Sequence, residues 1–128
     1  MADEKEMMSM SELTKLICGE MEFTFTIKDK LEMTLVELNQ KELVEIDNEM
    51  ISRGLKPDNY SPGYMSTLKV LKLVKAFKRL TNDGLAIDID KTKMEELLWA
   101  LGEGTIAGLY FKYEGTIADK FNQVQKKN

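Results

Sequence analysis

The stretch YMSTLKVLKLVKAFKRL, residues 64–80, is the centre of the expected fold. Its main apolar residues recur every three or four positions, which is the spacing of one helix face. They are Val70, Leu73, Val74, Phe77 and Leu80. Leu68, Leu71 and Ala76 widen this stripe to well over half of the helix surface. We therefore predict a helix over residues 64–81 that is mostly buried, either in the core or against a partner.

The charged residues of this expected helix all have one sign. They are Lys69, Lys72, Lys75, Lys78 and Arg79, in a chain whose net charge is −4. A nucleic-acid site requires a concentrated cationic face, but no aromatic residues alternate with these lysines on the polar side. We interpret the cations as the solvated face of a core helix, and we expect no nucleic-acid partner.

The length of 128 residues is that of one domain and allows about two-thirds of the unfolded surface to be buried. Residues 1–12 are acidic and have no periodicity, which predicts a disordered acidic tail followed by a single globular domain over residues 13–128. The acidic start MADEKEMMSM is not typical of a signal peptide. No window reaches the roughly 18 apolar residues of a membrane span, so we expect no membrane partner.

The sequence lacks the residues of common catalytic sites. It has no histidine and one cysteine, Cys18. Histidine is the commonest general base and a frequent metal ligand, and Cys18 has none to activate it. A lone cysteine excludes an internal disulfide and fits a reducing cytoplasm. We expect no enzyme activity, no catalytic residues and no small-molecule substrate.

Two groups of acidic residues have the wrong spacing for a site. The first surrounds Gly84 and consists of Asp83, Asp88 and Asp90. A calcium loop requires alternating oxygen ligands, a sixth-position glycine and a twelfth-position glutamate, so turns and helix caps explain these residues better. Glu95 and Glu96 are adjacent on an expected helix and point about 100° apart, which is unsuitable for an acid–base pair. We expect no metal and no cofactor.

Residues 21–27, MEFTFTI, alternate between apolar and polar side chains, which is the strongest strand signal in the sequence. A polar connection at residues 28–30 follows, and the alternation resumes at Leu31, Met33 and Leu35. The pattern predicts a β-hairpin over residues 21–36. Because a lone hairpin is unstable in water, its apolar face must lie on helices.

Three further helices are expected, at residues 40–53, 91–102 and 105–125. Asn39 and Glu42 have the spacing of a capping box, and Gly54 suits the end of the first of these helices. Asp90 can cap the second, in which we expect Trp99 to lie in the core. The predicted fold class is α+β, mainly α, with an N-terminal β-hairpin followed by about four helices.

The last helix carries an amphipathic stripe whose members step by three or four residues. The expected partner-binding residues belong to it: Ile106, Tyr110, Tyr113, Ile117 and Phe121. Gly108 and Gly115 lie inside this helix, where each costs roughly 1 kcal/mol relative to alanine. They permit either close helix packing or a hinge.

The order of these elements, with LNQKELVEID, NDG and LYFKYEGTIADKF, resembles the small tail assembly chaperones of long-tailed bacteriophages over residues 20–125. That resemblance implies a protein that keeps the long helical tape measure protein soluble during tail assembly. It implies self-association, a place in the cytoplasm of the infected host, and absence from the mature virion. No functional residue is carried over individually.

Two alternatives remain open. One is a small structural component of a phage tail or baseplate, which would stay in the particle. The other is a nucleic-acid-binding regulator that uses the basic helix.

Overall fold

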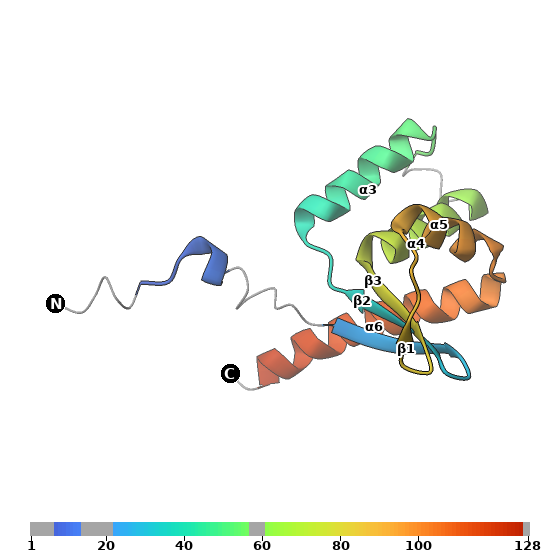
Figure 1. Ribbon diagram of the computed structural model, residues 1–128. Helices are drawn as coiled ribbons and strands as arrows, with labels where there is room; N and C mark the ends of the chain where they lie inside the picture. Colours follow the sequence, from blue (N-terminus) through green and yellow to red (C-terminus); the bar gives the residue numbers. More distant parts are fainter. Residues whose placement is uncertain (1–6, 14–21, 57–60, 127–128) are drawn as a thin grey trace.

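The structure is a computed structural model that describes residues 7–13, 22–56 and 61–126, with only the helical backbone for residues 120–126 (Figure 1). Its main elements are β1 (Glu22–Lys28), β2 (Leu31–Val36), α3 (Gln40–Ser52), α4 (Pro62–Ala76), β3 (Phe77–Asn82), β4 (Leu85–Ala86), α5 (Lys91–Ala100) and α6 (Glu103–Lys126). Within the described residues, helix is much more abundant than strand. The expected mixture of helix and sheet with mainly helical content is therefore confirmed. No helix of the described residues has the length and apolarity needed to cross a membrane.

The four strands form one antiparallel sheet in the order β1-β2-β3-β4. Phe23 lies opposite Leu35, and Met33 lies between Phe25 and Leu80. These apolar side chains share one face of the sheet because alternate residues of a strand point the same way. Helices α4 and α6 contact the sheet, and α3 packs on α4 at a greater distance from the strands (Figure 1).

The N-terminal hairpin matches the expected range only loosely. It begins at Glu22 within the described residues, and Met21 lies outside them. The connection is the two-residue turn Asp29–Lys30 rather than three residues. A bulge at Ile27 shifts the register, so that Lys28 and not Ile27 lies opposite Leu31. On the polar face, the hydroxyls of Thr24 and Thr34 are 3.0 Å apart and share a hydrogen bond.

The prediction of one helix through residue 81 is wrong. Helix α4 ends at Ala76, and Phe77 begins strand β3, which pairs with β2. Phe77 and Leu80 are three residues apart, which imitates helical spacing. In the sheet, a bulge at Lys78 turns both side chains to the buried face despite their odd separation. The pattern therefore has two structural explanations, and pairing with β2 decides between them.

The segment after β3 is a tight β-turn and not a helix end. Asp83 and Gly84 both have positive φ angles, 53° and 80°, as a two-residue hairpin turn of type I′ requires. Leu85–Ala86 then pairs back onto β3. The dipeptide Asp83-Gly84 is a typical sequence signal for this kind of hairpin.

The ends of the other helices agree closely with the sequence. The Asn39 side chain accepts from the amide of Glu42 at 2.8 Å, and the Glu42 carboxylate accepts from the amide of Asn39 at 3.0 Å, which confirms the capping box. Gly54 has a φ of 80° just beyond α3, a conformation that costs glycine little. Asp90 caps α5, as expected. Helix α5 ends at Ala100 and α6 begins at Glu103, within two residues of the expected bounds.

The buried residues form two clusters. The main core lies between the sheet and helices α4, α5 and α6 and centres on Met33, Leu35, Leu73, Met94, Leu98 and Tyr113. A smaller cluster joins α3 to α4 through Ile46, Met50, Tyr64 and Leu71. Helix α3 is thus attached to the domain through a core of its own.

Part of the expected disordered tail, residues 1–6, lies outside the described residues. Residues 10–13 form a single helical turn, in which the Ser9 hydroxyl accepts a hydrogen bond from the amide of Glu12 at 3.1 Å. Met7, Met8 and Met10 are exposed on this segment.

Candidate protein-binding surface

Part of the stripe expected to bind a partner belongs instead to the protein's own core. Ile106 is 7% exposed and Tyr113 is 1% exposed, both within the main cluster. Ile117 packs against the same cluster, and Tyr110 is half-buried. The side chain of Phe121 lies outside the described residues. The interpretation of this stripe as a free binding face is corrected for Ile106 and Tyr113, because α4 and strand β1 already contact this side of α6.

Tyr110 lies at the border of the core, where it contacts a lysine of α4. The Lys72 ammonium donates to the Tyr110 hydroxyl at 3.2 Å and lies 3.4 Å from a Glu114 carboxylate oxygen. Burial alone would lower the pKa of Lys72, but these two partners outweigh it and raise the pKa. Burial also raises the pKa of Tyr110. The side chains of Lys72, Tyr110 and Glu114 therefore connect α4 to α6, and each of them has a partner among the three.

Two aromatic side chains are exposed on neighbouring helices. Phe111 of α6 is 63% exposed, and Trp99 of α5 is 45% exposed. Lys69 of α4 lines a small cavity together with Trp99, and its ammonium lies 5.4 Å from the centre of the Phe111 ring. We define the aromatic surface as Trp99, Lys69 and Phe111.

The prediction that Trp99 lies in the core is wrong. Met94 and Leu98 are fully buried and turn one face of α5 inward, whereas the next residue on a helix points about 100° away. The indole N–H of Trp99 donates to the Glu95 carboxylate at 3.1 Å, which holds the ring in place at the surface. Phe111 was missed because it lies off the apolar stripe of its helix. Its position off the stripe is the sequence signal for an exposed aromatic.

The cavity beside Trp99 measures about 180 Å³. Its floor is apolar, formed by Val70, Leu98 and Ile106, and Ser66, Lys69 and Glu103 stand at its rim. This volume is below the roughly 300–1,000 Å³ of typical small-molecule sites. It suits one large apolar side chain of another protein better than a cofactor.

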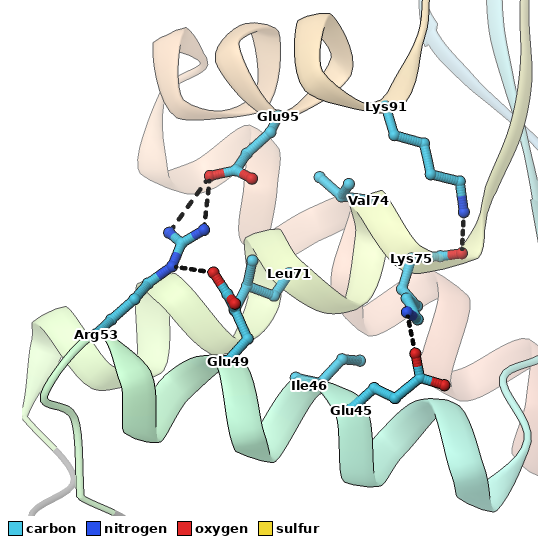
Figure 2. A pocket seen from close by; sticks show the side chains of 9 residues that line it. All are labelled: Glu45, Ile46, Glu49, Arg53, Leu71, Val74, Lys75, Lys91 and Glu95. Carbon is cyan, nitrogen blue, oxygen red and sulfur yellow. Dashed lines mark hydrogen bonds and ion pairs between the residues drawn. The ribbon is translucent and has the colours of Figure 1, made fainter.

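A second hollow of about 380 Å³ lies between α3 and α5 and is also lined by residues of α4 (Figure 2). Ile46, Leu71 and Val74 provide apolar side chains at its base. Figure 2 shows the side chain of Arg53, the residue that follows α3, extending across the hollow to Glu95 of α5.

The charged groups around this hollow neutralise one another. Arg53 lies 3.0 Å from Glu49 and 3.4 Å from Glu95, and the hydrogen bond with Glu49 is the main cause of its raised pKa. Lys75 lies 2.9 Å from Glu45 and lowers the pKa of that carboxyl. Lys91 donates to the carbonyl oxygen of Lys75 at 2.8 Å. The hollow therefore lies where three helices meet, and each charged side chain that lines it already has a partner.

Other cations of the basic stretch are likewise paired with acids. Lys78 and Arg79 share the carboxylate of Glu22 at 2.6 and 2.8 Å, and these contacts lower the pKa of Glu22 to about 2. Among the described residues, Lys69 has no carboxylate within ion-pair distance. No group of three or more metal-binding side chains occurs within the described ranges.

Comparison with protein-family models, with curated proteins and with solved structures finds no match. The interpretation of function therefore depends on the surfaces of this chain.

Proposed function

We propose that this protein is a phage tail assembly chaperone, which holds a helical tape measure protein through the aromatic surface. The observation that carries the proposal is the exposure of Trp99 and Phe111 near Lys69, which shares a cavity with Trp99 and whose ammonium lies 5.4 Å from the centre of the Phe111 ring. Large exposed apolar groups are typical of interaction sites when they gather in one place. Aromatic side chains also provide much of the binding energy at protein interfaces.

The position of these aromatics favours a protein partner over a small ligand. They come from α5 and α6, and the backbone beneath them is fixed by fully buried Leu98 and by Leu109. A rigid platform loses little conformational entropy on binding. The cavity beside Trp99 accommodates one apolar side chain of a helix, while neighbouring apolar residues of that helix cover Phe111.

Lys69 gives the surface its charge preference. Its ammonium lies near the Phe111 ring and has no acidic partner among the described residues, so an acidic side chain on the client helix would complement it. We expect this charge to affect the association rate and the salt dependence, and apolar contact to provide most of the affinity.

Several features support a binding protein rather than an enzyme. The chain has no histidine, and the acids and bases around the larger hollow are engaged with one another. Pairing of the basic residues with Glu22, Glu45 and Glu114 favours structural roles for them over nucleic-acid contacts. The proposal places the protein in the cytoplasm of the infected bacterium, without membrane association and with copies that contact one another.

The decisive experiment is co-expression with a tape measure protein, the client that the proposal names. The variants Phe111→Asp and Trp99→Ala should leave the client insoluble, because both remove apolar area from an exposed position. Leu85→Asp is the matched control, since Leu85 is 74% exposed on β4 and lies outside the aromatic surface. It should preserve client solubility.

Two results would contradict the proposal. If the client is equally soluble with and without this protein at matched expression, the chaperone function is wrong. If the protein is found in mature virions in a fixed stoichiometry, the structural tail component replaces it.

A further inference from the structure

Within the part of the chain that the structure describes, strand β1 forms one edge of the sheet. It is the first strand in the order β1-β2-β3-β4, so among the described residues it has a strand neighbour on one side only. It is seven residues long, whereas β4 at the opposite edge has two. An unpaired edge of this length presents backbone donors and acceptors that can pair with another strand.

The residues Glu22–Thr26 form a regular edge. Their pairing with β2 keeps one register, and the bulge begins only at Ile27. Natural proteins usually protect an edge with proline, lysine, a bulge or a very short strand. The five residues EFTFT contain neither proline nor lysine, and the bulge lies beyond them.

The apolar layer also remains incomplete at this edge. Phe23 is buried, but Phe25 and Ile27 on the same side of β1 are only partly buried against the main core. Helix α6 packs against β1, but the described residues leave these two side chains partly exposed. A further strand beside β1 would cover these side chains and continue the apolar layer.

We propose that β1 pairs with β1 of a second copy of this chain, antiparallel and around a two-fold axis at Thr24. This axis pairs all five regular residues. Thr24 then lies opposite its own counterpart, Phe23 lies opposite Phe25, and Glu22 lies opposite Thr26. Directly opposed residues share a face, so the phenylalanines of both copies meet on the apolar face.

The charges of β1 favour antiparallel pairing with a second copy of the same strand. Antiparallel pairing about Thr24 keeps the two Glu22 carboxylates four residues apart, about 13 Å along the strand. Parallel self-pairing in register would place them next to each other. Glu22 also keeps its contacts with Lys78 and Arg79 of β3, because those residues belong to its own copy.

The proposed interface accommodates two copies and no more. A two-fold contact uses the same patch in both copies, and the opposite edge, Leu85–Ala86, is too short to recruit a third. We therefore expect a dimer with one continuous eight-stranded sheet. The interface uses no residue of the aromatic surface and does not depend on the chaperone function.

Disulfide trapping tests the register. In a Cys18→Ser background, which removes the chain's other thiol, Thr24→Cys should give a covalent dimer under mild oxidation. Thr26→Cys should stay monomeric under the same conditions, because its counterpart lies about four residues away. Covalent dimers from both variants would indicate parallel pairing and overturn the proposal, as would none from either.

A matched pair of lysine variants tests the same contact by analytical ultracentrifugation. Thr24→Lys places two like charges opposite each other and should weaken the dimer by about fivefold, the upper range for one cross-strand pair. Thr26→Lys places lysine opposite Glu22 and should strengthen it. A wild-type chain that is monomeric up to millimolar concentration, or equal effects of both lysines, would refute the proposal. Client solubility is a separate readout, so failure of either proposal can be recognised alone.

Discussion

The hydroxyl of Tyr113 donates a hydrogen bond of 2.6 Å to the carbonyl oxygen of Val36, which joins α6 to the last residue of β2. The ring of Tyr113 also meets Phe23 edge to face, with 6.3 Å between the ring centres. Burial raises the pKa of this tyrosine far above its usual value, so it stays neutral and remains a donor. The final helix is thus fixed to the hairpin by a polar contact inside an apolar core.

We predict that Tyr113→Phe destabilises the domain by about 1–3 kcal/mol, because the partly buried carbonyl of Val36 loses its donor while the packing remains. Chemical denaturation measures the loss. Tyr110→Phe is the control and should cost less, since Tyr110 is half-buried and its lysine partner retains Glu114. An equal effect of both changes would contradict a special role for the contact with Val36.

The second prediction concerns acid stability. Hydrogen bonds from Arg79 and Lys78 lower the pKa of Glu22 from 4.5 to about 2. A pKa that is depressed by folding contributes stability that is complete above the unfolded value and is lost as the pH falls through the folded value. Glu22→Gln should therefore be less stable than wild type at pH 7. The difference should shrink between about pH 4.5 and pH 2.

Denaturation midpoints of both proteins between pH 7 and pH 2 test this expectation. Glu32→Gln is a control on the neighbouring strand. A difference between wild type and Glu22→Gln that does not change with pH would show that the ion pairs with Arg79 and Lys78 are not its source.

The third prediction concerns the glycines of α6. A Cβ atom added to Gly108 or Gly115 would meet no atom within 4 Å, so the fold does not require glycine there. Each substitution to alanine should stabilise the protein by about 1 kcal/mol through helix propensity. Thermal unfolding of both variants provides the measurement. A decrease in stability would show that the helix bends at these residues.

The sequence predicted local structure well where side chains act on their own backbone. The capping box at Asn39, the cap at Asp90 and the turn of the chain at Gly54 all depend on residues within a few positions. The alternation in β1 also indicated the correct strand, because a period of two has no helical equivalent.

Prediction failed where distant residues decide the outcome. Phe77 and Leu80 fit a helix as well as a bulged strand, and pairing with Met33 and Leu35 of β2 selects the strand. The aromatic surface was missed for a different reason. Met94 and Leu98 have the spacing of the inward face of α5, and both Trp99 and Phe111 lie off the apolar stripes of their helices, which is a signal for exposure.

The last prediction concerns the attachment of α3. This helix packs on α4 through the small cluster that includes Ile46 and Met50, and it is not part of the main core. A surface ion pair between Arg53 and Glu95 connects the end of this helix to α5. Elements with few buried contacts open at lower free energy than the global unfolding. We expect amides of α3 to exchange with solvent faster than those of α4.

Arg53→Ala should increase this difference. Both partners are about one-third exposed or less, at 34% for Arg53 and 27% for Glu95, and exposed pairs typically contribute about 0.2–1 kcal/mol. Hydrogen exchange should therefore accelerate about fivefold at most in α3 and remain unchanged in α6. Lys41→Ala, an exposed change elsewhere on α3, is the control. If exchange in α3 and α6 accelerates together, α3 is not an independent unit and the domain opens as a whole.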